Sequence, residues 1–262
     1  MIIATTTWPG PSVVQPMIER PTAMRLAQTE YQRVTDAVDA LQPEDWTRPT
    51  DCTAWDVRQL VAHIAGQANL FSTPVELAHQ MRGAKARERP GREGVDALTA
   101  FQVEERQHLG SEELRAELHR VGPRGAKGRR RIPGFLRRKR LPGTEVVNGV
   151  AETWSVGYLI DVILTRDPWM HRLDLARATG QHLVHTADHD GVIVADVVAE
   201  WARRHGRPYR LELTGPAGGS WNSGTGGEEV VMDAADFCRV LSGRPGPDGG
   251  QPCGLLTTQV PF

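Results

Sequence analysis

A nearly apolar stretch near the middle of the chain constrains the fold most. Residues 155–164 read SVGYLIDVIL, so apolar side chains face almost every side of the helix that this segment predicts. A helix of this kind is buried in a domain core, since a surface helix keeps one polar face. Pro168 follows closely, and proline lacks a backbone N–H and clashes one turn back. We therefore expect a kink there, or a fresh helix start with Asp167 as N-cap, and an end at Gly180.

Residues that can bind a metal surround Pro168. Asp167 and His171 are four residues apart, so both side chains lie on one face of a helix, and Asp174 lies close to the same line. A carboxylate and an imidazole are metal ligands, but they are two short of a tetrahedral site. A helix cap explains Asp167 equally well. Asp174 either orients His171 or accepts a hydrogen bond from Arg177.

The first part of the chain predicts two long helices. Apolar residues recur at steps of three and four from Thr22 to Leu41, which indicates an amphipathic helix. A second helix is expected to begin at a capping sequence around Thr53 and to run to about Leu70. His63 lies at the edge of its apolar face. It is either a boundary histidine bonded to a neighbouring acceptor or the third metal donor.

The next region is less regular. Residues 72–94 are rich in Arg, Gly and Pro and predict a poorly fixed connection with a short helical piece inside it. A third helix is expected from Val95 to Leu109, and a short one from Ser111. The main helices should pack as a four-helix bundle that carries the metal ligands inside. A His-Asp-His set leaves a coordination position open, which suits a catalytic metal.

Charge and cysteines limit the class of protein. The 262 residues carry a net charge of -1 and are 39% hydrophobic, which fits one large or two small globular domains. This bulk charge predicts neither a nucleic-acid nor a membrane partner. Three cysteines without paired spacing argue for a reducing compartment, and the first twenty residues lack a signal-peptide pattern. We expect a cytoplasmic protein.

The strongest charge anomaly is the segment from Arg120 to Arg140. It contains ten Lys or Arg residues and no acid. Taken alone, such a run could contact nucleic acid or a membrane surface. No second basic element or base-stacking motif accompanies it. A solvated loop, or a loop at 124–140 that closes over an anionic ligand, is therefore favoured.

The pattern changes after His185. A helix is expected from about Asp188 to Arg204, followed by alternating strands with glycine-rich turns and a short helix from Asp233 to Gly243. This order predicts a small α+β domain. We place the domains at residues 20–183 and 184–262. The glycines at 215–227 lack the spacing of a phosphate-binding loop.

Two helical motifs resemble a known family. CTAWDVRQLVAHIAG at 52–66 and TRDPWMHRLDLARATG at 165–180 are similar to the N-terminal domain of the mycothiol-dependent maleylpyruvate isomerase family, a DinB-like metal-binding four-helix bundle. RPYRLELTGPAGGSW at 207–221 and AADFCRVLSGR at 234–244 resemble the sterol-carrier-like α+β domain of that family. The resemblance implies an α plus α+β fold, with the bundle first and the carrier-like domain second.

The resemblance also implies a set of ligands. His63 and His171 match two histidines that hold the metal of the family, usually zinc, and Asp167 stands where the family has Glu. The thiol cofactor of the family, mycothiol, would bind as a metal thiolate. Gln67 shares a helix strip with His63 and is expected at the cofactor. The basic segment, including Arg130 and Arg131, is expected to help hold the cofactor or an anionic substrate; no further catalytic residue is assigned.

Two functions remain open at this stage. The first is a metal-dependent, thiol-using enzyme of the isomerase or S-transferase type, acting on a small organic substrate through a metal-activated thiolate or water. The alternative is a non-catalytic small-molecule or lipid-binding protein that keeps both domains, because a fold alone does not fix a function. Either is expected to be a monomer or a homodimer. Cys52, just before the second helix, is expected to be a buried small residue rather than a nucleophile.

Overall fold

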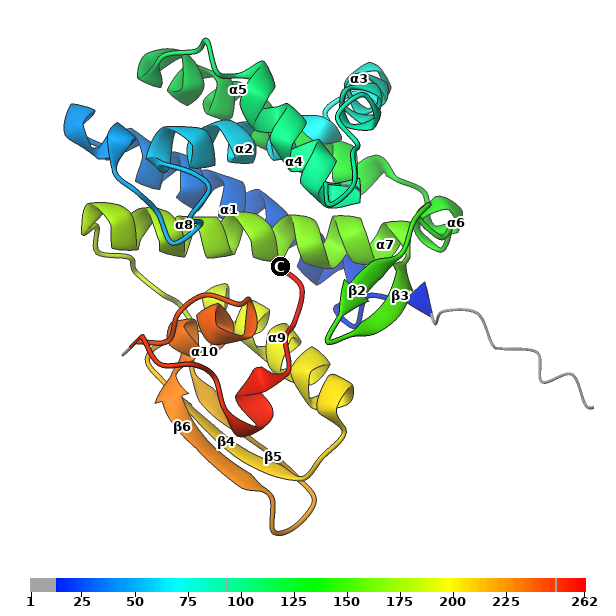
Figure 1. The fold of residues 1–262 in the computed structure, drawn as a ribbon, viewed down its shortest axis with the longest axis vertical. Helices are drawn as coiled ribbons and strands as arrows, with labels where there is room; N and C mark the ends of the chain where they lie inside the picture. The colour runs from blue at the N-terminus through cyan, green and yellow to red at the C-terminus, as the bar shows by residue number, and fades with distance from the viewer. Residues whose placement is uncertain (1–12, 93, 248) are drawn as a thin grey trace, which may run out of the picture.

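The computed structural model describes residues 13–92, 94–247 and 249–262 (Figure 1). Residues 1–12, part of the twenty N-terminal residues that lack a signal-peptide pattern, lie outside the described residues. A helical bundle forms the upper part of Figure 1 and an α+β unit the lower part, so the expected fold class is confirmed. The bundle and its covering helices are α1 (Arg20–Asp39), α2 (Val57–Leu70), α3 (Pro74–Lys85), α4 (Gly94–Glu105), α5 (Ser111–Arg131) and α8 (Leu164–Thr179).

One long helical run forms the floor of the bundle, above the α+β unit (Figure 1). It begins with α7 (Val156–Tyr158), passes through a π-helical turn η2 (Leu159–Ile163), and continues as α8. Pro168 lies inside α8, so the fresh helix start with Asp167 as N-cap is wrong. Gly180 ends α8 with a φ of 74°, as expected for a C-cap.

The buried side chain of Arg129 stabilises the irregular part of this run. Its Nε donates to the carbonyl of Ile160 and its Nη1 to the carbonyl of Leu164, both at 2.8 Å. The Leu164 carbonyl has no helix donor because Pro168 lacks an N–H. The N–H of Leu164, which is the regular α-helical donor to the Ile160 carbonyl, bonds instead to Leu159. Arg129 thus bonds to two carbonyls that lack their regular α-helical donor.

The cap of α2 differs from the expected one. Asp56, and not Thr53, is the N-cap: its carboxylate accepts from the backbone N–H of Gln59 at 2.8 Å. The side chain of Gln59 accepts from the N–H of Asp56 in return. This reciprocal pair satisfies two free amides and fixes where α2 begins.

Two segments are more helical than expected. The helical piece predicted within residues 72–94 is the longer helix α3, and α5 extends into the predicted loop as far as Arg131, followed by α6 (Gly134–Arg137). Two glycines of α5 allow close packing against the end of α2. A Cβ at Gly125 would lie 2.0 Å from the carbonyl oxygen of Ala68, and one at Gly128 would lie 1.6 Å from that of Phe71. Only glycine therefore allows α5 to approach α2 this closely.

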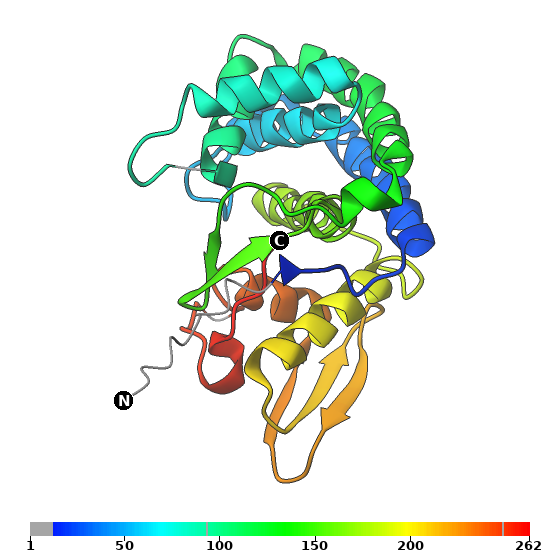
Figure 2. The ribbon, with the colours of Figure 1, turned by 90° about the vertical axis from the view of Figure 1, so that its right-hand side faces the viewer.

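A small sheet follows the basic segment. β2 (Glu145–Val147) and β3 (Val150–Trp154) form an antiparallel hairpin, and β1 (Val13–Val14) pairs with β3 in parallel. Figure 2 shows this hairpin beside the end of the α7–α8 run. The hairpin therefore forms one wall over the region where α8 carries its polar residues.

The C-terminal unit contains α9 (Asp190–His205), β4 (Tyr209–Thr214), β5 (Gly219–Ser223), β6 (Glu228–Asp233), α10 (Ala234–Leu241) and a 3-10 turn η3 (Gly254–Thr257). The sheet order is β5-β4-β6, with β4 antiparallel to β5 and parallel to β6. Its core around Trp201 and Phe237 continues onto Trp169 and Met170 of α8. The α+β unit therefore packs directly on the helix that carries the candidate ligands. The boundary between residues 183 and 184 stays a prediction.

No helix among the described residues has both the length and the hydropathy needed to cross a membrane.

Candidate metal centre

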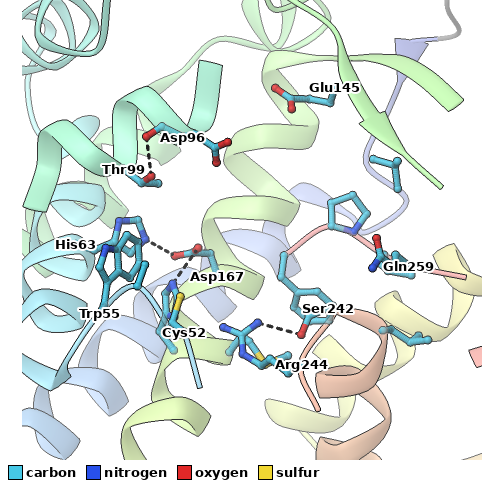
Figure 3. Close-up of a pocket in the computed structure, with 18 of the residues that line it drawn as sticks. Cys52, Trp55, His63, Asp96, Thr99, Glu145, Asp167, Ser242, Arg244 and Gln259 are labelled. Atoms are coloured by element: carbon cyan, nitrogen blue, oxygen red, sulfur yellow. Dashed lines mark hydrogen bonds and ion pairs between the residues drawn. The ribbon is translucent and has the colours of Figure 1, made fainter. Parts of the chain in front are cut away.

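Three possible metal ligands meet between α2 and α8. His63 comes from α2, and Asp167 and His171 come from α8. One ligand atom of each lies within 4.8 Å of the others. The carboxylate of Asp167 lies between the two imidazoles, with Oδ2 at 3.3 Å from Nε2 of His63 and Oδ1 at 3.3 Å from Nε2 of His171 (Figure 3). The sequence pattern therefore corresponds to one cluster in space.

The cluster is buried and electrostatically coupled. The side chains of His63 and His171 are 2% and 6% exposed. Burial alone would raise the pKa of Asp167, but the two adjacent imidazoles hold that pKa well below its ordinary value. Burial alone would lower the pKa of His171, but the carboxylates of Asp167 and Asp174 raise it to about 9. Asp167 is thus an ionised carboxylate, ready to bind a cation.

Asp174 fixes the orientation of His171. Nδ1 of His171 lies 3.1 Å from Oδ2 of Asp174, which leaves Nε2 directed at Asp167. Asp174 is fully buried and accepts from Arg244 at 2.6 Å and 2.5 Å. An imidazole held by a buried carboxylate on its far nitrogen is the usual arrangement of a metal-binding histidine. Arg244 follows α10, so the C-terminal unit helps to hold a ligand of the bundle.

The far nitrogen of His63, Nδ1, is buried and has no hydrogen-bonding partner among the described residues, so packing positions that side of the ring. The indole of Trp55 lies against it, with ring centroids 4.9 Å apart, and also reaches the ring of His171 at 5.9 Å. Trp55 belongs to the motif at 52–66, but nothing in the sequence alone assigned it a role.

The three residues predicted to bind the cofactor, Gln67, Arg130 and Arg131, lie in two different places. Gln67 lies beside the cluster, where its Nε2 donates to Oδ2 of Asp167 at 2.5 Å. Arg130 and Arg131 stand at the C-terminal end of α5 and line a different hollow, which shares no residue with the pocket at His63. The loop that was expected to close over an anionic ligand there is a helix. The arginines that do line the metal pocket are Arg92 and Arg244.

The ligands open into a pocket of about 640 Å³. Asp96 of α4 and Glu145 of β2 line one end of it, and Arg244 lies at the other (Figure 3). Burial raises the pKa of Glu145, and the carboxylates of Asp96 and Glu152 raise it further. The C-terminal residues 259–262 complete the wall. The pocket thus presents both acceptors and donors to a polar ligand.

Cys52 also lines the pocket without being a reactive thiol. Burial raises the pKa of the Cys52 thiol to about 11. A thiol with such a pKa is almost entirely protonated near neutral pH and is a poor nucleophile. Any thiolate used in this pocket must therefore come from a bound molecule.

Comparisons with known proteins agree with this geometry. A family model described as the mycothiol maleylpyruvate isomerase N-terminal domain matches residues 27–176. The chain belongs to this family. The matched range includes His63, Asp167 and His171, so all three candidate ligands lie within the family domain.

Solved structures extend the likeness to nearly the whole chain. Crystal structures of the mycothiol-dependent maleylpyruvate isomerase and of its histidine-to-alanine mutant each match with a TM-score of 0.55 and 17% sequence identity. The match covers 94% of this chain and 98% of the isomerase. At this identity the likeness shows the fold, in which both the bundle and the α+β unit are shared. No curated protein matches the chain.

The donor set of this family member fits a divalent metal ion. One donor atom of each of the three residues lies within 4.8 Å of the others, and each imidazole lies 3.3 Å from a different oxygen of Asp167. Two imidazoles and one carboxylate are also a common ligand set of catalytic zinc sites, with the fourth position left for water or substrate.

Proposed function

We propose that the protein is a metal-dependent, thiol-using enzyme of the isomerase or S-transferase type. The observation that carries the proposal is the cluster of His63, Asp167 and His171, buried at one side of a pocket that can admit a small molecule. Three protein ligands leave a coordination position for a fourth, exchangeable one. Relatives named for mycothiol dependence and maleylpyruvate isomerisation support mycothiol as the thiol and a small organic substrate.

The residues of the chain would have distinct parts in such a reaction. His63, Asp167 and His171 would hold the metal, which supplies an activated thiolate or a Lewis acid when bound. Asp174 keeps Nε2 of His171 directed at the site. The acids Asp96 and Glu145 lie where they can accept hydrogen bonds from the hydroxyl or amide groups of a polar cofactor.

The pocket wall can also exclude water from the reacting thiolate. Trp55 covers the imidazoles of His63 and His171 on one side. Val260, Pro261 and the ring of Phe262 line the pocket from the C-terminal unit. A partly apolar wall strengthens electrostatic interactions at the centre, because fewer waters compete for the charged groups.

The alternative of a lipid-carrying protein finds no support in the C-terminal unit. Trp201, Phe237 and Leu211 are fully buried and fill the core of that unit. An apolar cavity there would favour lipid binding. The pocket at the bundle, which charged and apolar side chains line together, instead favours chemistry on a small molecule.

Metal analysis of protein purified without chelator tests the proposal. We expect about one zinc or other divalent ion per chain, and its loss from His63→Ala and His171→Ala. His79→Ala is the matched control, since His79 is half exposed on α3 and lies outside the pocket. Retention of metal by both pocket variants, or its equal loss from His79→Ala, would contradict the site.

The thiol is tested separately on the cobalt-substituted protein. A thiolate bound to cobalt gives a strong ultraviolet absorption band that thiols in solution lack. We expect this band when mycothiol is added to the wild-type chain and not when it is added to the metal-free protein. A site that binds cobalt but shows no such band would leave a metal protein that does not use mycothiol.

A further inference from the structure

The basic segment has two structural residues and a larger exposed remainder. Arg129 and Arg137 are buried, the first bonded to the α7–α8 run and the second paired with Asp161. The other Lys and Arg side chains between Arg120 and Arg140 are exposed. The metal pocket uses none of them. Their function must therefore be sought outside that pocket.

A groove between α1 and α5 contains three of these exposed cations. The two helices lie side by side in Figure 2, and the groove between them has a volume of about 820 Å³. We call it the basic groove. Its walls are formed by Gln28, Thr29, Tyr31, Gln32 and Thr35 of α1 and by His119, Pro123, Ala126, Lys127, Arg130 and Arg131 of α5. No carboxylate is among these lining residues.

Among the described residues, the cations of the basic groove have no carboxylate partners. Several buried arginines do, as Arg172 pairs with Glu30 at 2.7 Å. Within the part of the chain that the structure describes, Lys127, Arg130 and Arg131 form no ion pair. Arg130 makes one side-chain contact, in which its Nη2 donates to Oε1 of a neutral glutamine at 3.3 Å. Three positive charges therefore face one concavity without compensation.

The other polar groups of the groove are neutral or already paired. His119 lies 2.9 Å from Oδ2 of Asp39, outside the groove, so its imidazole already has a partner. Gln28 and Thr29 offer hydrogen-bonding groups on the opposite wall. Tyr31 also lines the groove, is fully buried, and directs its hydroxyl toward Oε1 of Gln67 at 3.5 Å. The groove thus joins a cationic wall to a neutral polar one.

We infer that the basic groove binds a small molecule that carries a phosphate group. A phosphate monoester has a charge near -2 and three acceptor oxygens, which match converging arginine and lysine donors. The neutral wall suits the hydroxyl-bearing remainder of such a molecule. A volume of this size holds a sugar phosphate or a nucleotide. The site is separate from the metal pocket, with which it shares no lining residue.

The arrangement favours a small ligand over nucleic acid or a membrane. The net charge of the chain is -1, so its overall charge does not attract a polyanion. Arg120 and Arg124 lie on the same helix but do not line the groove. A polyanion or a lipid surface would contact the cations inside and outside the groove together. A small ligand contacts only the cations that line the groove.

Calorimetric titration of the full chain at physiological salt with glucose 6-phosphate tests the inference. Glucose is the uncharged control, because it differs from glucose 6-phosphate only in lacking the phosphate group. We expect glucose 6-phosphate to bind and glucose not to bind. Lys127→Gln combined with Arg130→Gln should weaken binding by about tenfold or more, because charge-assisted hydrogen bonds are lost.

Arg120→Gln combined with Arg124→Gln is the control, since it removes the same charge from the same helix. It should change the affinity by less than about threefold, as expected for charges that do not touch the ligand. Equal weakening by both double variants, or no binding of glucose 6-phosphate, would overturn the inference. Binding of duplex DNA or of anionic vesicles would also overturn it, if both double variants weakened that binding equally. Fluorescence polarisation measures binding of DNA, and pelleting measures binding of vesicles.

Discussion

Replacing Arg129 with methionine is expected to destabilise the protein far more than the same change at Arg130. Arg129 is 1% exposed and donates to the carbonyls of Ile160 and Leu164. Methionine fills most of the same space without any donor. Arg130 is exposed and makes one long side-chain contact, so it is a neighbouring control of equal chemistry.

The magnitude follows from the two carbonyls. Each buried acceptor left without a partner costs about 1–3 kcal/mol, so Arg129→Met should lower the free energy of unfolding by about 2–6 kcal/mol. For a chain of this size that is a fall in Tm of roughly 4–24 °C. Arg130→Met should stay within about 0.5 kcal/mol of wild type. Thermal and urea unfolding, followed by circular dichroism, measure both.

A double-mutant cycle with Pro168→Ala tests the cause of the loss. Alanine at 168 supplies an N–H that can bond to the carbonyl of Leu164, which then needs Arg129 less. The cost of Arg129→Met in the Pro168→Ala background should therefore be smaller by about 1–3 kcal/mol. Equal stabilities of Arg129→Met and Arg130→Met would refute the reasoning, as would an unchanged cost in the Pro168→Ala background.

Two further predictions concern the metal. Asp174→Asn should weaken zinc binding by about 10–100-fold, because His171 loses the carboxylate that orients it. Competition with a chelator measures this affinity. Asp45→Asn is the control: Asp45 is also a buried acid but contacts none of the candidate ligands, so zinc affinity should not change. Zinc affinity should also fall as pH decreases. The pKa of His171 in the metal-free protein is raised to about 9, so zinc must displace a proton from this residue below that pH. The affinity should therefore drop by about tenfold for each pH unit. A flat pH profile from about 6 to 9 would contradict that pKa.

The candidate metal ligands could be predicted from the sequence because two of them depend on local geometry. Asp167 and His171 are one helical turn apart, and α8 places them on one face as expected. His63 was a candidate third donor from its place on the second helix, and the resemblance to the family, which the family model confirms, strengthened that prediction. The N-cap interpretation of Asp167 was wrong because the helix does not break at Pro168.

The groups that support the candidate ligands were much less predictable. Arg244 is 70 residues from Asp174 in sequence, and its contact depends on how the α+β unit packs on α8. No local pattern encodes such packing. The helix at residues 124–131 was missed for a related reason: the run of basic residues predicted a loop, whereas Gly125 and Gly128 allow close contact with α2. Propensity favours a loop there, and tertiary packing overrides it.

The role of Arg129 connects the basic segment to the metal centre in a way that charge counting could not show. The π turn at 159–163 adds one residue to the helical run, which rotates the following residues by about 100° relative to a regular α-helix. The face that carries Asp167 and His171 therefore depends on that turn. Arg129 bonds to a carbonyl inside the turn and to one just after it. Arg129 was predicted to lie in a loop at an anionic ligand. It instead stabilises the helix geometry that directs Asp167 and His171 at His63.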